Sequence, residues 1–452
     1  MAKDRSPGFK LGMTVLIGAL LAIPLFMVYA LVWDRQSQSE TARASVAEGW
    51  GGPQMLAGPV MVIPYRQQSV ETVTENGKAS TRAVTVEREL FLAPVKNDAA
   101  VDVSPERRVK SIYETVVYEA RVKGTARFAL PEDLARFGVR PEELLLDRAE
   151  IRVGISDARG LLADNGISVR GEPLPLRPGK GLGATDGSGF FAFADWSAAS
   201  GAPLDVSYRF GVRGNGQLTL IPDAESTTWS VTSTWPHPSF AGQFLPNSRA
   251  VTDKGFTARY AISNLALGRA IVQLPQPGEV VGQGAGGAQS AQIDLIEPVN
   301  LYSQVDRAVK YGFLFIGFTF LAFLMFDIIA GARVAAAEYL LTGAGLILFF
   351  VLLLAFAEII GFTLAYLAAS GAVIGLISAY SAAVLGSVKR AGFIGGLLLG
   401  LYALLYVLLN LEAYSLIIGS VLLFVALAAV MYVTRRVDWS GLGKRDEVAD
   451  AA

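Results

Sequence analysis

Residues 339–385 read YLLTGAGLILFFVLLLAFAEIIGFTLAYLAASGAVIGLISAYSAAVL, and their one charged side chain is Glu358. A helix needs about 20 mostly apolar residues to cross a bilayer. The stretch is therefore long enough for two crossings. The polar break near Glu358 divides it into two predicted spans, 339–356 and 362–385.

Four more apolar runs accompany this pair, at 11–33, 311–330, 393–409 and 414–433. With 52% hydrophobic and only 17% charged residues, the chain is too apolar for an ordinary soluble protein. We therefore predict a membrane α-helical bundle of six transmembrane helices, with a large β-rich periplasmic domain inserted between helices 1 and 2. The predicted divisions are a cytoplasmic N-terminus (1–10), helix 1 (11–33), the periplasmic domain (34–308), a five-helix bundle (309–433) and a cytoplasmic tail (434–452).

The first apolar run could instead be a cleaved signal peptide. Its apolar stretch is much longer than the roughly 7–15 residues of a signal core. The Ala-x-Ala sequence at Ala42–Ala44 lies too far beyond it to serve as its cleavage site. We therefore expect an uncleaved membrane anchor.

Basic residues next to the spans predict the orientation, because positive charge favours the cytoplasmic side. A six-span scheme with both termini inside places these cations in the cytoplasm: Lys3, Arg5, Lys10, Arg333, Lys389, Arg390, Arg435 and Arg436. Glu358 and Glu412 then fall in outer turns, and Arg307 and Lys310 break the pattern. In a bacterium this chain would be a multi-pass protein of the inner (cytoplasmic) membrane, in contact with the lipid bilayer.

The polar segment 34–308 contains repeated alternation of apolar and polar residues, which predicts half-buried strands. We expect antiparallel sheets, packed as one sandwich or as two related lobes. Short helices should begin at Pro131 and Pro141, which are each followed by two acids. A further amphipathic helix is expected at Asp34–Glu48. The predicted strands are 84–92, 116–122, 151–155, 206–212, 229–235 and 256–262.

Composition also argues against several functions. The chain has no cysteine, and its single histidine is His237, so thiol, iron–sulfur and histidine-based chemistry are disfavoured. A net charge of −1 indicates no nucleic-acid partner. The Gly282-x-Gly284-x-x-Gly287 sequence lacks the flanking strand and helix of a dinucleotide site, so it is interpreted as a flexible loop. We predict no cofactor, no metal and no catalytic residues.

Several motifs recur in a characteristic order: GWGGPQMLAGPVMVIPY at 49–65, WPHPSF at 235–240, RAVKYGFLFI at 307–316 and TRRVDW at 434–439. This series resembles the CreD family of bacterial inner-membrane proteins over about residues 10–440. The resemblance implies a role in cell-envelope integrity, expression tied to a two-component system that responds to envelope or carbon-source conditions, and no established enzymatic activity.

The chain also departs from the family pattern. The family commonly has His-Pro-x-Gln where this chain has Ala335–Glu338. It often has Ser-Glu-His where this chain has Ala357, Glu358 and Ile359. No role for those histidines can therefore be transferred to this chain.

Three groups of residues are candidate sites. The proline-stiffened loop with Trp235, His237 and Phe240 is a candidate partner-binding loop. Asp327 and Glu338 are candidate membrane acids near the cytoplasmic interface, either solvated there or clustered near Arg333. Stripes of small residues predict helix-packing seams within the bundle, with an interface in a homo-oligomer as the alternative. The stripes are Gly371, Gly375 and Ala379, and Gly392, Gly396 and Gly400.

Taken together, these features favour a non-enzymatic protein of the envelope or its stress response. Its periplasmic domain would bind a periplasmic protein or an envelope ligand. A transporter or channel is the alternative, although it would need polar residues along a path through the membrane. A wall-active or intramembrane hydrolase is the third hypothesis, because sequence does not show whether two carboxylates meet.

Overall fold

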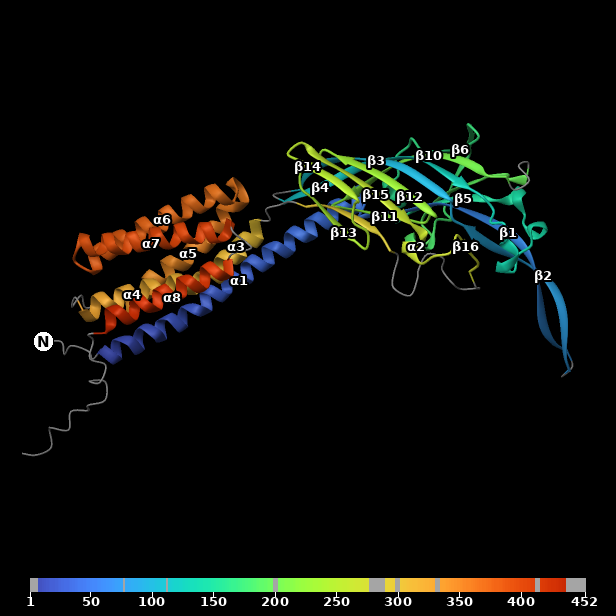
Figure 1. Cartoon of the computed structure of the whole chain (residues 1–452). Coiled ribbons are helices and arrows are strands. Elements are labelled where there is room, and N and C mark those ends of the chain that lie inside the picture. Colours follow the sequence, from blue (N-terminus) through green and yellow to red (C-terminus); the bar gives the residue numbers. More distant parts are fainter. Residues whose placement is uncertain are drawn as a thin grey trace, which may run out of the picture. The chain divides into compact units, whose positions relative to one another are not determined.

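The computed structural model of the chain describes residues 7–75, 78–110, 113–197, 202–275, 289–296, 301–329, 334–410 and 415–435. The chain divides into two compact units. A helical unit comprises residues 1–40 and 299–452, and a β unit comprises residues 41–298. Both are drawn in Figure 1, coloured along the sequence.

Among the described residues, five helices are long and apolar enough to cross a membrane: 8–50, 301–327, 336–360, 362–384 and 388–410. A further helix, α8, covers the last predicted span but is not one of these five. The sixth crossing therefore stays a prediction. The predicted helix at Asp34–Glu48 is not separate, because α1 runs without interruption from Pro7 to Trp50. The helices are α1 Pro7–Trp50, α3 Leu301–Lys310, α4 Gly312–Ile329, α5 Ala336–Ile360, α6 Phe362–Val384, α7 Val388–Asn410 and α8 Ser415–Thr434.

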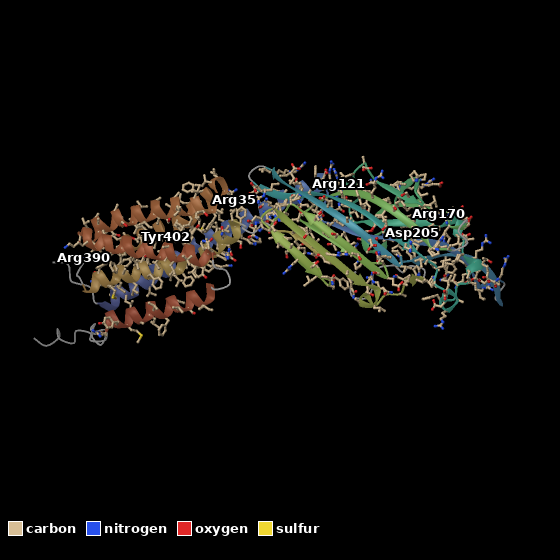
Figure 2. All side chains as sticks on the ribbon, turned by 45° about the horizontal axis from the view of Figure 1, so that its top comes forward. Arg35, Arg121, Arg170, Asp205, Arg390 and Tyr402 are labelled. Atoms are coloured by element: carbon tan, nitrogen blue, oxygen red, sulfur yellow. The ribbon has the colours of Figure 1, made fainter. Side chains whose placement is uncertain are left out.

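Aromatic side chains fill the interior between α4, α5, α6 and α7. The ring of Tyr402 lies 4.5 Å from that of Phe349 and 4.7 Å from that of Phe315, measured between centroids. The Tyr366 hydroxyl donates a hydrogen bond to the Tyr402 carbonyl oxygen over 2.6 Å. Figure 2 shows Tyr402 among the helices. Because lipid is as apolar as these side chains, such close packing and hydrogen bonding hold the bundle together.

The β unit is built from two sheets. In the nine-stranded sheet the order is β13-β17-β11-β1-β5-β9-β8, with β2 beside β1 and β16 beside β2. Its strands are β1 Gln54–Glu75, β2 Lys78–Leu92, β5 Glu150–Ile155, β8 Leu176–Pro178, β9 Gly189–Phe193, β11 Gln217–Ile221, β13 Pro238–Gly242, β16 Val272–Gln273 and β17 Ala291–Leu295.

In the eight-stranded sheet the order is β14-β15-β12-β3-β4-β10-β6-β7. Its strands are β3 Lys96–Lys110, β4 Tyr113–Phe128, β6 Gly166–Val169, β7 Glu172–Leu174, β10 Leu204–Asn215, β12 Ser226–Ser233, β14 Ser248–Thr252 and β15 Gly255–Ser263. Neighbouring strands are antiparallel except for one parallel pair in each sheet, β1 with β11 and β3 with β12.

One continuous core joins the inner faces of both sheets. Along β10, Val206, Tyr208, Phe210 and Val212 point inward and are buried, while Ser207 and Arg209 between them are exposed. Residues of both sheets belong to the same buried cluster. The strands therefore form one unit rather than two lobes. Each of the six predicted strands lies on a strand of the structure, although the prediction for 229–235 runs two residues past the end of β12 at Ser233.

The connecting segments follow local sequence rules. A short 3-10 helix occupies Pro141–Glu143 with its proline at the first position, as predicted, and another occupies Leu134–Phe137 shortly after Pro131. The glycine-rich stretch 177–189 is ordered, and its Lys180 binds Glu150 of β5 over 2.7 Å. The sequence from Gly282 to Gly287 lies outside the described residues.

Candidate ligand-binding face of the eight-stranded sheet

A shallow depression of about 980 Å³ lies on the eight-stranded sheet of the β unit. Its lining comes from β3, β4, β6, β7, β10, β12 and β15 and the segments beside them. Small and hydroxyl-bearing side chains dominate, together with four cations and one acid. The charged lining residues are Lys96, Lys123, Arg209, Arg259 and Asp98.

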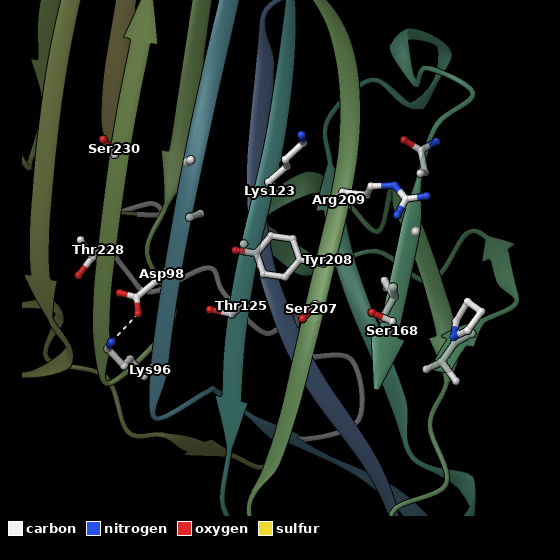
Figure 3. Close-up of a pocket in the computed structure, with 18 of the residues that line it drawn as sticks. Lys96, Asp98, Lys123, Thr125, Ser168, Ser207, Tyr208, Arg209, Thr228 and Ser230 are labelled. Carbon is white, nitrogen blue, oxygen red and sulfur yellow. Dashed lines mark ion pairs between the residues drawn. The ribbon is translucent and has the colours of Figure 1, made fainter. Parts of the chain in front are cut away.

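Strand register arranges these side chains in two adjacent rows across the sheet. The first, which we call the cationic row, pairs Arg259 with Ser230, Ser230 with Ala100, Ala100 with Lys123, and Lys123 with Arg209. The second, the hydroxyl row, lies two residues along each strand. It consists of Thr228, Asp98, Thr125, Ser207 and Ser168. Figure 3 shows the labelled members of both rows.

A tyrosine of β10 that packs over a glycine of β4 holds these two strands together beneath the rows. Tyr208 faces Gly124 on the neighbouring strand, and its hydroxyl donates a hydrogen bond to Asn97 Oδ1 over 2.6 Å. A Cβ atom at Gly124 would overlap the Tyr208 hydroxyl. Only glycine therefore lets this ring cross β4 beneath the rows. Burial raises the pKa of the Tyr208 hydroxyl, so it remains a protonated donor.

A second tyrosine–glycine pair lies on the same two strands, with the tyrosine now on β4 and the glycine on β10. Tyr118 of β4 faces Gly214 of β10, and its hydroxyl donates to the carbonyl oxygen of Gln217 over 2.6 Å. A Cβ atom at Gly214 would overlap this tyrosine as well. The two pairs clamp β4 to β10, which carry Lys123 and Arg209.

The cations of the face are only partly compensated. Lys96 pairs with Asp98 over 2.5 Å, and Arg209 Nε lies 3.2 Å from the exposed carboxylate of Asp164. Within the ranges that the structure describes, neither Lys123 nor Arg259 has a carboxylate within ion-pair distance. The face therefore carries an excess of positive charge.

The nine-stranded sheet contains a contrasting ionic group. Arg152 of β5 binds Glu150 over 2.8 Å and Glu89 over 2.6 Å, and Lys180 binds the second oxygen of Glu150. Glu150 and Arg152 are buried, with side chains 6% and 7% exposed. Two acids offset two cations here, so this cluster is a closed structural network that holds the 177–189 segment in place.

The loop predicted to bind a partner is only partly on the surface. Trp235 is buried, and its Nε1 donates a hydrogen bond to the carbonyl oxygen of Ile296 over 3.0 Å. Phe240 is half-buried with its ring 5.6 Å from that of Phe256, while His237 is exposed. Trp235 therefore anchors the loop to the core, and only the other two positions offer surface.

The two predicted membrane acids have separate roles. Asp327 of α4 is buried and binds Lys10 of α1, with Nζ 2.8 Å from Oδ1. Glu338 accepts a hydrogen bond from the Ala335 backbone N–H over 2.7 Å and so caps the start of α5. Arg333, near which an acid cluster was predicted, lies outside the described residues.

The small-residue stripes do not form the predicted seams within the bundle. Among the described residues, no atom lies within 4 Å of a Cβ built at Gly371, Gly375, Gly392, Gly396 or Gly400. Gly375 and Ala379 are exposed. The four-residue spacing aligns small residues on one side of a helix, but the described residues place no neighbouring helix against that side. Close helix contacts lie instead at other glycines, such as Gly343 against Leu21 of α1 and Gly395 of α7 against Ser378 of α6.

Several helices long and apolar enough to cross a membrane, in a chain that also forms a large unit of two sheets, define a class of membrane protein with an extensive β domain. The family model described as "Inner membrane protein CreD" matches residues 6–440. The chain is also 32% identical over 443 residues to Inner membrane protein CreD of Escherichia coli (strain K12), covering 94% of this chain and 93% of that protein. The chain belongs to the CreD family of inner membrane proteins.

The open face was not predicted from the sequence. Its signal is the outward half of each alternating pattern, such as Lys123 and Thr125 or Ser207 and Arg209. Those positions resemble the solvated side of any strand. Their alignment in rows depends on the pairing of strands distant in sequence, such as β3 with β12.

Proposed function

We propose that this protein supports the integrity of the cell envelope without catalysing a reaction. In this proposal its β unit binds an envelope component or a protein partner, and the helices anchor that unit to the inner membrane. The observation that carries the proposal is the open, cation-rich depression on the eight-stranded sheet. A broad polar surface with several donors suits recognition of a large ligand.

The proposal places the β unit in the periplasm and both termini in the cytoplasm. The distribution of basic residues around the spans supports this orientation. A sixth crossing by α8 completes it, since that helix has 20 residues and no charged side chain. An even number of crossings then returns the tail to the side on which the chain began.

The binding role can be tested by crosslinking in living cells. A photoreactive amino acid at Ala100, an exposed position in the depression, should capture a defined envelope component or protein. The same probe at Glu132, an exposed loop position outside the depression, serves as the control. Capture of bulk lipid alone at Ala100, or identical products at both positions, would contradict the proposal.

A blocking substitution connects this surface to the envelope role. Ala100→Trp should fill the centre of the depression without entering the core, because Ala100 points away from it. In cells that lack the native protein, the variant should reach normal levels yet fail to restore survival under envelope stress. Full rescue by Ala100→Trp would separate the depression from the envelope role.

A transporter or channel is the second candidate, because the helices contain buried polar groups. Asp327 and Lys10 form a charged pair between α4 and α1. The hydroxyls of Thr319 and Thr342 are buried without a hydrogen-bond partner in the described part of the chain. Buried ionisable groups in membrane helices often mark transport pathways. Ion or solute flux in liposomes that Asp327→Asn abolishes would favour this candidate.

A further inference from the structure

We infer that the cationic and hydroxyl rows together form a binding site for an extended anionic saccharide that carries phosphate or carboxylate groups. The inference rests on the proposed function, because it names the class of ligand that the β unit would bind. It is carried by the register of the strands, the unpaired charges and the chemistry of the lining side chains.

The first argument is a like-charge pair at directly opposed positions. Lys123 of β4 faces Arg209 of β10, and both side chains are exposed. Like charges directly opposite each other on neighbouring strands destabilise a sheet. Asp164 contacts Arg209 Nε, but it is itself 85% exposed and does not pair with Lys123. An anionic group held between the two cations would relieve their repulsion.

The second argument is the row of hydroxyls beside these cations. Thr125 and Ser207 are also directly opposed, one row along the same strands. A phosphate or carboxylate bound to Lys123 and Arg209 would lie within one strand repeat of these two donors. Hydroxyls can both donate and accept, which suits the alternating donors and acceptors of a sugar. Asp98, the one acid of the lining, is already paired with Lys96.

The third argument is the length of the cationic row. It runs from Arg259 on β15 through β12, β3 and β4 to Arg209 on β10. Adjacent strands lie about 4.8 Å apart, so four intervals place the ends of the row roughly 19 Å from each other. A single small anion cannot reach both ends. The ligand must be extended, with negative groups spaced along it.

The lining also distinguishes a saccharide from other polyanions. Tyr208 and Ile167 beneath the depression are buried, and the half-buried Leu174 lies at its margin, on the edge strand β7. A protein partner is normally held by aromatic or apolar anchors in the centre of the interface. Single-stranded nucleic acid needs exposed aromatic rings on which bases stack. The described lining offers hydroxyls and cations instead, which match a charged sugar chain.

The test uses the full-length protein in nanodiscs of phosphatidylcholine, so that no anionic lipid competes. A heparin-derived octasaccharide serves as the anionic probe, and maltooctaose and inorganic phosphate as comparisons, all measured by calorimetry. The octasaccharide should bind, and its affinity should fall as salt is added. The double variant that carries Lys123→Gln and Arg209→Gln should bind the octasaccharide at least tenfold more weakly. Lys254→Gln, which removes an exposed cation from a turn outside the depression, should leave it unchanged.

Several outcomes would overturn the inference. They are an absence of octasaccharide binding, equally tight binding of maltooctaose or phosphate, and an equal loss from Lys254→Gln, which would indicate unspecific charge attraction. Each of these leaves the proposed function standing if the probe at Ala100 still captures a protein. Failure of that crosslink with intact octasaccharide binding would instead contradict the proposed binding role in cells and leave the saccharide chemistry of the face standing.

A second measurement does not depend on any ligand. Because Lys123 and Arg209 repel each other, Lys123→Gln should raise the thermal unfolding temperature of the β unit at low salt. The gain should shrink as salt screens the repulsion. A lowered unfolding temperature would show that the Lys123 side chain stabilises the β unit instead of repelling Arg209, and this would remove the first argument.

Discussion

At the scale of single residues, the most unusual carboxyl group of the β unit is that of Asp223. It accepts a hydrogen bond from the Gly58 backbone N–H over 3.0 Å, and Arg269 Nη1 lies 3.6 Å away. Burial outweighs both contacts and raises the pKa of Asp223 to about 6. The folded protein therefore holds this proton at pH values where the unfolded chain has released it.

This pKa predicts a decline in stability as the pH rises. The contribution of Asp223 should be fully present below about pH 4, the ordinary aspartate pKa, and lost as the pH rises through about 6. A shift of two units corresponds to roughly 2–3 kcal/mol in the free energy of unfolding. Urea unfolding followed by tryptophan fluorescence should show this slope in the native protein. Asp223→Asn should flatten it, whereas the exposed Asp253→Asn should leave it intact.

The tyrosine–glycine pairs give a second prediction at this scale. Gly124→Ala should destabilise the β unit, because the new methyl group would overlap Tyr208 and lie 2.9 Å from the Asp98 carbonyl oxygen. Overpacking of this kind costs about 1–3 kcal/mol. Gly166→Ala on the same sheet is the matched control, since its nearest neighbour would be 3.6 Å away. Equal unfolding midpoints for the two variants would contradict this account of the clamp.

At the scale of helices, glycines that look alike in sequence have different surroundings. A leucine at Gly343 would collide with Leu21, and even its Cβ would lie 3.0 Å from Phe320, whereas Gly375 has open space. Gly343→Leu should therefore lower the thermal stability of the helical unit in detergent, by about 1–3 kcal/mol. Gly375→Leu should leave a monomer unchanged. A similar loss from both would mean that the α6 stripe is also covered, as in a homo-oligomer.

Sequence patterns predicted some elements well and others poorly, for identifiable reasons. Alternation at 206–212 and 256–262 marks β10 and β15 because one side of each strand is buried. The sequence patterns did not predict β1, because Gly58, Pro59 and Pro64 interrupt its alternation. The spacing of small residues on α6 identified a stripe but not the direction in which it faces. The rows of the candidate site depend on strand register, which a single sequence does not encode locally.

At the scale of the whole molecule, the orientation in the membrane determines where every surface acts. A periplasmic reporter such as alkaline phosphatase should be active when inserted at the exposed turn Asp253–Lys254 and inactive when fused after Trp439. Green fluorescent protein fused after Trp439 should fluoresce, because it folds in the cytoplasm. The opposite result at either position would reverse the proposed compartments and remove the periplasmic binding role.

The ion pair between Lys10 and Asp327 has a consequence for biosynthesis. The partners are 317 residues apart, and the β unit lies between them in the sequence. At roughly 5–20 residues per second, Asp327 is synthesised about 15 to 60 seconds after Lys10. We expect α1 to remain in contact with the insertion machinery during this interval, with the Lys10 side chain extended toward the lipid headgroups. Pulse-labelled chains halted before Asp327 should then crosslink to the translocon through α1, and completed chains should not.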